Sequence, residues 1–468
     1  MPCHGLRKGE QTLDRRTFLK LAAGTAIGAG ISASLPKLLL GSAQPSLYWG
    51  AYISGSTYGI NPATGTAYGT PPWDLSSWDL FESHAGKKVS ILHWGQAWYA
   101  SAQWPYGYCP FLPSLASAVR SRGAIPLIDW GSRDMSASGS LTQPNFSLGN
   151  IINGMHDAYI QQWATDAKAW GYPLFLRFDW EMNGNWYPWS ELANGNSAGQ
   201  FVTAWRHVHD IFTSVGANNV TWVWCPNINS SAMIPMAEVY PGDAYVDWTG
   251  LDGYNKYSTW LSFNTVFTGS GITWLYDSYQ ELLALAPSKP IMIAETASLE
   301  AGDGGAKKAA WITDTLTTQI PANFPAIKAF VWFNWNSAGS TFAIESSSAA
   351  QMAFATAIAS TNYAANEFGG LAPGTKIAPL NPAAATATPT RTRTTTPTSG
   401  PTSTATRTAA PSATKTSTAG PTKTNTPKPT ASKTATPVPT KTQTPTSTPT
   451  KKHGRSTIVF LPALLGNS

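Results

Sequence analysis

The sequence predicts one α/β domain, an eight-stranded (β/α) barrel of the TIM-barrel class, followed by a disordered Thr/Pro-rich tail. Eight short apolar runs alternate with amphipathic stretches between residues 48 and about 360. All 21 Trp lie between Trp49 and Trp335, whereas residues 383–455 contain no aromatic residue and consist mostly of Thr, Pro, Ala and Lys. The 468 residues therefore hold one hydrophobic core rather than several.

Each apolar run is short enough to be a buried strand, and most are followed by a helical pattern. A doubly wound open sheet is the alternative, but no Gly-rich phosphate turn follows the first run. The predicted strands are residues 47–53, 88–94, 124–130, 173–180, 220–225, 246–254, 290–294 and 326–335. The predicted helices are residues 112–122, 151–170, 198–215, 273–285, 304–318 and 349–358.

The formal net charge of +6 combines regions of different character. Residues 1–43 carry six Lys or Arg and two Asp or Glu, and residues 391–455 carry eleven Lys or Arg and no acid. The remaining 14 basic and 23 acidic residues give the central region a net charge of −9. An acidic, Trp-rich domain repels a phosphate backbone, so we expect no nucleic-acid binding and favour a neutral polymer as the partner.

The N-terminus carries Arg15 and Arg16 before an Ala- and Gly-rich apolar run at residues 21–40. This pattern predicts a twin-arginine export signal over residues 1–43, and hence a secreted bacterial protein. An N-terminal membrane anchor is the alternative, although the run is weakly apolar for a span.

The predicted catalytic domain covers residues 44–375. Its two cysteines, Cys109 and Cys225, could form one bridge after export, although a buried free thiol is the simpler interpretation for Cys225. The chain has no CxxC and no His/Cys cluster, and no pattern indicates a metal site or another cofactor.

A linker of Thr-Pro and Thr-Lys units is predicted over residues 376–455. It cannot bury enough apolar surface to offset its ordering entropy, so we expect it to be extended. The apolar segment that follows, residues 456–468, is too short to span a bilayer and could attach the protein to the cell surface. We expect a monomer.

Two glutamates close predicted strands at the barrel end where chemistry occurs: Glu181 and Glu295. Strand alternation predicts that Arg177, Asp179 and Glu181 share one face, opposite Trp180. A structural ion pair, for example with Arg177, is the alternative role for each glutamate. Two glutamates on separate strands among Trp and Tyr are typical of a retaining glycosidase, whose carboxyl groups stand about 5–5.5 Å apart.

Residues 177–189, which read RFDWEMNGNWYPW, resemble the acid/base motif of glycoside hydrolase family 26. Residues 289–295, KPIMIAE, are similar to the family's nucleophile strand, and residues 250–255, GLDGYN, to its sixth strand. The resemblance covers residues 48–360. It implies a (β/α)-barrel retaining hydrolase with the catalytic glutamates on the fourth and seventh strands.

The resemblance implies that Glu181 is the general acid/base and Glu295 the nucleophile. Tyr254 would hydrogen-bond the nucleophile, and Trp332 would form the floor under the reacting sugar. One departure stands out: family members commonly have His before the acid/base, and this chain has Trp180, whose indole cannot accept a hydrogen bond.

Other side chains at strand ends fit a carbohydrate groove, because sugar faces stack on flat rings. A single Trp is more often a core residue, and His93 fits a core position as well as a contact with a sugar hydroxyl. The predicted substrate-binding residues are Arg177, Trp180, Trp186, Trp189, Tyr254, Trp332, His93, Trp94 and Trp130.

The sequence thus predicts an endo-β-1,4-mannanase that acts on mannan-type polysaccharides by double displacement. Mixed-linkage β-1,3-1,4-glucan and β-1,3-xylan are the alternative substrates within the same chemistry. A non-catalytic carbohydrate-binding barrel is the alternative of another class.

Overall fold

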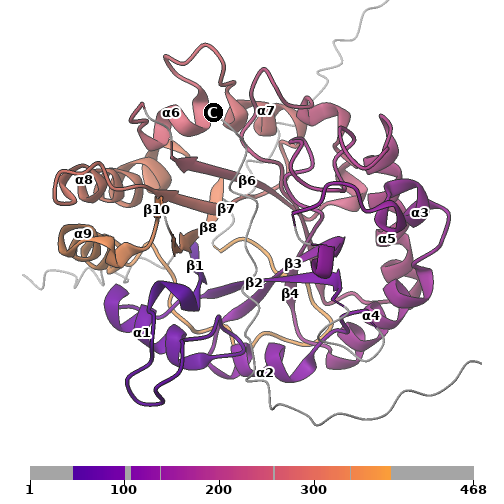
Figure 1. Ribbon diagram of the computed structural model, residues 1–468, viewed down its shortest axis with the longest axis horizontal. Helices are drawn as coiled ribbons and strands as arrows, with labels where there is room; N and C mark the ends of the chain where they lie inside the picture. The colour runs from indigo at the N-terminus through magenta and orange to yellow at the C-terminus, as the bar shows by residue number, and fades with distance from the viewer. Residues whose placement is uncertain (1–45, 101–106, 138, 257–258, 338, 381–468) are drawn as a thin grey trace, which may run out of the picture. The chain divides into compact units, whose positions relative to one another are not determined.

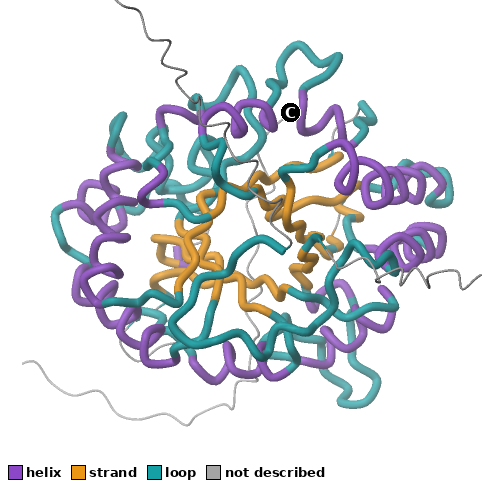
Figure 2. Tube along the Cα trace, turned by 180° about the vertical axis from the view of Figure 1, so that it is seen from behind, coloured by secondary structure: helices purple, strands orange, loops and turns teal. Residues whose placement is uncertain are grey.

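The computed structural model describes residues 46–100, 107–137, 139–256, 259–337 and 339–380. Within these ranges, eight parallel strands close a barrel in sequence order, with β8 paired to β1. Helices surround the strands (Figures 1 and 2). The predicted (β/α)8 fold is therefore confirmed. The strands are β1 (Tyr48–Ile53), β2 (Ile91–Tyr99), β3 (Ile125–Asp134), β4 (Leu174–Phe178), β5 (Val220–Trp224), β6 (Trp248–Asn255), β7 (Ile291–Ser298) and β8 (Ile327–Asn334).

The helices mostly follow the amphipathic stretches of the sequence. They are α1 (Leu75–Ala85), α2 (Pro113–Ser121), α3 (Leu148–Ile152), α4 (Asp157–Trp170), α5 (Gln200–Val215), α6 (Phe263–Thr268), α7 (Ser278–Leu285), α8 (Ala306–Asp314) and α9 (Ser348–Ile358). A π-helical segment, Thr315–Asn323, continues α8. A small antiparallel pair, β9 (Asn336–Ser337) and β10 (Ser340–Thr341), follows β8.

The structure differs from the expected helices at three places. The helix expected over residues 151–170 is two helices, because Gly154 adopts a left-handed conformation (φ 80°) between α3 and α4. Helices α1 and α6 were not expected. The sequence does carry capping signals for α1: Asp74 accepts a hydrogen bond from the Ser76 amide at 2.9 Å, and Gly86 ends the helix in a left-handed conformation.

Aromatic side chains fill the layer between the strands and the helices. Trp130 on β3 packs against Trp163 and Phe212 of α4 and α5, with ring centroids 4.8 and 5.7 Å away. Trp332 on β8 packs against Trp311 and Phe354 of α8 and α9, at 6.1 and 5.2 Å. Because strand side chains alternate, the residues beside these tryptophans point into the barrel.

The chain after α9 crosses the end of the barrel where the strands begin. The Ile377 carbonyl accepts from Trp248 Nε1 at 2.8 Å, the Ile377 amide donates to Thr221 Oγ1 at 2.9 Å, and Tyr48 donates to the Ala378 carbonyl at 2.9 Å. This segment appears as an orange loop in Figure 1. The folded unit thus continues through Leu380, five residues beyond the expected boundary at 375.

Several predictions concern other parts of the chain. The twin-arginine segment, nearly all of the Thr/Pro linker and the apolar C-terminal segment lie outside the described residues. Among the described helices, none combines the length and the hydropathy needed to cross a bilayer. Cys109 and Cys225 are both buried, and no disulfide joins them in the described part of the chain. Burial raises the pKa of Cys225 well above its usual value.

Candidate active site

The chain leaves β4 through two residues with left-handed backbone, Asp179 (φ 40°) and Glu181 (φ 53°). Such a conformation costs a non-glycine residue about 1–3 kcal/mol and needs contacts that hold it in place. Ser132 supplies them at Asp179, donating from its amide and its hydroxyl at 2.7 Å each. The Glu181 amide donates to the Cys225 carbonyl at 2.8 Å. Burial raises the pKa of Asp179 to about 8, although the Ser132 hydrogen bonds lower it.

This turn corrects the expected alternation along the fourth strand. Regular strand geometry ends at Phe178, so the side-chain directions of residues 179–181 no longer follow the strand's period of two. As a result, Trp180 does not lie opposite the polar residues. It lines the same cavity as Glu295 on β7.

The Glu181 carboxyl is 8% exposed and accepts two hydrogen bonds. Asn227 Nδ2 donates to Oε1 at 2.5 Å, and Trp186 Nε1 donates to Oε2 at 2.7 Å. Burial, followed by the repulsion of the Glu295 charge, raises the pKa of Glu181, and the two hydrogen bonds only partly offset this. Glu181 therefore keeps a proton to higher pH than an ordinary glutamic acid does.

Glu295 lies on β7, is 3% exposed and has very different partners. Arg177 Nη2 donates to Oε1, and the Tyr254 hydroxyl donates to Oε2. Burial, together with the Glu295 and Asp252 charges, raises the pKa of Tyr254 well above its usual value, so the phenol stays protonated. The site thus surrounds this carboxylate with a cation and a hydroxyl donor.

Arg177 on β4 is fully buried and is shared by three carboxylates. Its Nε and Nη2 donate to Asp129 at 2.6 Å each, and Nη1 donates to both Asp252 oxygens at 2.7 and 2.8 Å. We predicted Arg177 as a substrate-binding residue, and the structure corrects this. All three of its nitrogens bond carboxylates, so Arg177 acts by positioning Glu295.

His93 on β2 lies in the same cavity and is buried. Its Nε2 stands 2.8 Å from Asp129 Oδ2, an ion-pair distance without hydrogen-bond alignment. One ligand atom each from His93, Asp129 and Glu295 lie within 4.8 Å of one another, a spacing that could hold a metal ion. Because the Arg177 guanidinium already bonds Asp129 and Glu295, we interpret the cluster as an ion-pair network.

The aromatic residues predicted to bind substrate separate into two groups. Trp180 and Trp186 lie beside the carboxyl groups, Trp180 in the cavity wall and Trp186 bonded to Glu181. Tyr52 on β1 and Phe333 on β8, which were not predicted, also line the cavity.

The structure corrects the prediction that the other four tryptophans bind substrate, because all four are buried and none lines the cavity. Trp130 and Trp332 point outward to the helices, and Trp94 alternates with the cavity residues His93 and Gly95. Trp189 is buried behind Trp180, where its Nε1 donates to the Trp180 carbonyl at 2.7 Å. None of these four indoles has a free face for a sugar in this structure.

The polar residues missed in the sequence come from strand ends. Asp129, Asn227 and Asp252 each lie near the end of a predicted strand and take part in the hydrogen bonds described above. The strand-end rule that selected the two glutamates could have found them too. Arg133 on β3 carried no such signal, because it follows the end of the strand that the apolar run predicts.

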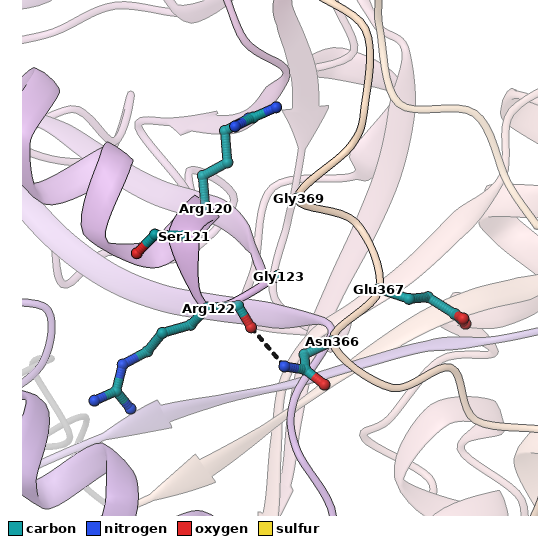
Figure 3. Close-up of a pocket in the computed structure, with 7 residues that line it drawn as sticks. All are labelled: Arg120, Ser121, Arg122, Gly123, Asn366, Glu367 and Gly369. Carbon is teal, nitrogen blue, oxygen red and sulfur yellow. Dashed lines mark hydrogen bonds between the residues drawn. The ribbon is translucent and has the colours of Figure 1, made fainter.

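A second cavity lies at the other end of the barrel, where α2 leads into β3 (Figure 3). It is lined by Arg120, Ser121, Arg122, Gly123, Asn366, Glu367 and Gly369. Asn366 Nδ2 donates to the Arg122 carbonyl at 2.5 Å across it. This cavity faces away from Glu181 and Glu295, so it has no part in their chemistry.

Comparison with known proteins agrees with this geometry. Residues 136–291 match the family model of glycosyl hydrolase family 26. Endoglucanase H of Acetivibrio thermocellus is 34% identical over 300 residues, which are 61% of this chain and 29% of that protein. A mannan endo-1,4-beta-mannosidase of Bacillus subtilis is 28% identical over 137 residues, which are 28% of this chain and 32% of the relative.

The matched segments span less than a third of the length of these two relatives. Among solved structures, that of the Bacillus subtilis mannanase BCman is 18% identical with a TM-score of 0.47. It covers 69% of this chain and 88% of its own.

Proposed function

We propose that the chain is a member of glycosyl hydrolase family 26, whose model matches residues 136–291, and that it is a retaining endo-β-glycanase with Glu295 as nucleophile and Glu181 as acid/base. One observation carries the proposal. Two buried carboxyl groups at one end of the barrel have opposite environments: Glu295 is paired with a cation, while burial and the Glu295 charge raise the pKa of Glu181. This difference in environment favours Glu295 as the nucleophile and Glu181 as the acid.

In the first step, the Glu295 carboxylate attacks the anomeric carbon and forms a glycosyl ester. Glu181 protonates the glycosidic oxygen, so the carbon–oxygen bond breaks and the aglycone leaves as an alcohol. Arg177 and Tyr254 hold the Glu295 oxygens in position for the attack. Asn227 and Trp186 hold the Glu181 carboxyl.

In the second step, esterified Glu295 no longer carries a charge. Burial still raises the pKa of Glu181, but the added repulsion from Glu295 is then gone, so Glu181 ionises more readily and can accept a proton from water. The resulting hydroxide equivalent attacks the anomeric carbon, releases Glu295 and leaves the sugar with its original configuration.

For the polymer, we propose a β-linked glycan with a mannan-type β-1,4 backbone. The similarity to a Bacillus mannan endo-1,4-beta-mannosidase supports this substrate. A β-glucan is the second candidate, and two observations favour it. The longer match is to a protein named an endoglucanase, and Trp180 stands where the family commonly has His, so recognition of the reacting sugar differs.

The test is reducing-sugar release by the full chain from mannan, glucomannan, barley β-glucan, β-1,3-xylan and carboxymethyl cellulose. Release from mannans supports the mannanase, and release from barley glucan alone supports the glucanase with the same two glutamates. Binding of these polymers without hydrolysis would contradict the enzyme and support the carbohydrate-binding alternative. Proton NMR of the first product formed decides retention.

We further propose a monomeric enzyme that is exported by the twin-arginine route. The pattern that supports the export route is Arg15 and Arg16 before the apolar run at residues 21–40. Replacing both arginines by lysine should hold the protein inside a bacterial host that has the twin-arginine pathway. Unchanged export would contradict that route.

A further inference from the structure

Arg133 lines the cavity that contains the proposed nucleophile, but it has no role in the mechanism above. Asp129, Gly131 and Arg133 are alternate residues of β3, and Asp129 and Arg133 both line the cavity that contains Glu295. Arg133 is only 8% exposed, so its guanidinium belongs to the cavity wall rather than to the outer surface.

Three aromatic rings lie close to this guanidinium. A Cβ atom on Gly131 would stand 2.9 Å from the Trp189 ring and 3.1 Å from the Trp180 ring, so the glycine lets both indoles lie against β3. The Arg133 Cζ atom then lies 5.8 Å from the ring centroid of Trp180, 5.5 Å from that of Tyr187 and 5.7 Å from that of Trp189. Cation–π attraction at these distances fixes the guanidinium in place.

Arg133 has no hydrogen bond and no ion pair with any residue in the described part of the chain, and its Nε is buried. The nearby acids are already engaged, Asp129 by Arg177 and Asp179 by Ser132. Burial lowers the pKa of Arg133. A buried guanidinium without an acceptor is costly, so the cavity is complete only when something supplies oxygen atoms.

The indole beside Arg133 has no free donor of its own. Trp180 has a single N–H, and it donates to the Tyr187 hydroxyl at 3.1 Å. The indole at this position therefore offers a sugar an apolar face and no hydrogen bond. Arg133 presents several N–H groups in a fixed plane above the same ring.

We propose that Arg133 is a specificity-determining residue that donates hydrogen bonds to hydroxyl oxygens of the sugar unit bound against Glu295. The inference rests on the proposed function, because it assumes that this cavity receives the reacting sugar. Arg133 then supplies the polar contact that Trp180 cannot make.

The test compares the full-length wild type with Arg133→Met and Arg133→Lys. Arg120→Met is the matched control, since the Arg120 guanidinium also lies on an aromatic ring, 3.7 Å from the Tyr172 centroid, in the cavity at the opposite end of the barrel. The substrates are an aryl β-oligosaccharide of the preferred polymer and its 2-, 3- and 6-deoxy analogues at the reacting unit. Melting temperatures are measured in parallel.

We expect Arg133→Met to lower kcat/KM roughly 10- to 100-fold, the loss of hydrogen bonds from a charged donor, and Arg133→Lys to lower it less. With wild type, kcat/KM for one deoxy analogue should be lower than for the parent substrate by a similar factor. With Arg133→Met, kcat/KM for the same analogue should be almost equal to that for the parent substrate. Arg120→Met should match wild type.

Arg133→Met with kcat/KM within twofold of wild type would overturn the inference. So would equal deoxy penalties in wild type and Arg133→Met, because a purely structural arginine would leave them unchanged. Wild type inactive on every polymer would instead contradict the proposed function, so the two failures are distinguishable.

Discussion

The ends of β4 and β7 each bring a glutamate to the site, but they do so by different means. Glu295 lies within regular strand geometry and is held by a buried cation and a phenol. Glu181 lies past the end of its strand, on left-handed backbone, and is held by neutral donors. Both carboxyl groups are almost fully buried, so burial alone does not make their environments different. The difference between the two environments comes from the charge of their partners.

The largest test of this contrast removes each carboxyl. Glu295→Ala and Glu181→Ala should each lower kcat on polymer by at least about 10³-fold, because each abolishes one chemical role. With an activated aryl leaving group and added azide, Glu295→Ala should form the α-glycosyl azide and Glu181→Ala the β-glycosyl azide. NMR of the products checks this.

Glu238→Ala serves as the control, because Glu238 is exposed at the end of the short 3-10 helix Met236–Glu238. Formation of the same azide anomer by both active-site variants would contradict the assignment of two distinct roles. Full activity in both would contradict the site itself.

The second test concerns the cation that distinguishes the two ends. Arg177→Met leaves Asp129, Asp252 and Glu295 without their shared partner, which should cost about 3–5 kcal/mol of unfolding free energy. Arg122→Met removes a more exposed pair with Asp79 and should cost about 0–1 kcal/mol. Denaturant titration measures both losses of unfolding free energy, and equal losses would show that the three-carboxylate network contributes no more than the surface pair.

The third test removes the phenol that only Glu295 has. Tyr254→Phe should lower kcat roughly 10- to 100-fold with little change in melting temperature, because Glu295, the proposed nucleophile, loses one positioned donor. Tyr240→Phe is the control, since the Tyr240 hydroxyl donates to Asp243, outside the site, at 2.7 Å. A variant as active as wild type would mean that Arg177 alone positions Glu295.

The smallest expected effect concerns the donors on Glu181. The Trp186 hydrogen bond lowers the pKa of Glu181, so Trp186→Phe should raise that pKa further. The acid must be protonated to act, and the alkaline limb of kcat/KM should therefore move to higher pH, by up to about one unit. Trp170→Phe, which removes a remote bond to Ser117, should leave the limb in place. A shift to lower pH would contradict this role of Trp186.

The sequence predicted the strand order well because each strand is a separate apolar run, and it predicted Glu181 and Glu295 because an acid closing such a run is unusual. Of the partners, the resemblance implied Tyr254 for Glu295, and an ion pair with Arg177 was named only as an alternative role. Asn227, Trp186 and the two aspartates around Arg177 were not predicted as partners. Arg177 meets residues 48, 75 and 118 positions away, and these contacts exist only after the barrel closes. The roles of the two glutamates remain proposals.

The errors have a common physical origin. A strand's pattern does not say which of two neighbouring aromatic residues faces inward until its register is known. On β8, Phe333 faces the cavity, and Trp332, which was expected there, packs against α8 and α9. Past Phe178, left-handed backbone replaced the alternation altogether.

The loop that carries Ile377 across the starts of β1, β5 and β6 also has a mechanical consequence. Its hydrogen bonds secure the chain on the side of the barrel away from the two glutamates. A pulling force applied beyond Leu380 would first load this loop and its three bonds, before it reached the residues around Glu181. The geometry around the two glutamates is thus mechanically shielded from a load that enters the folded unit at Leu380.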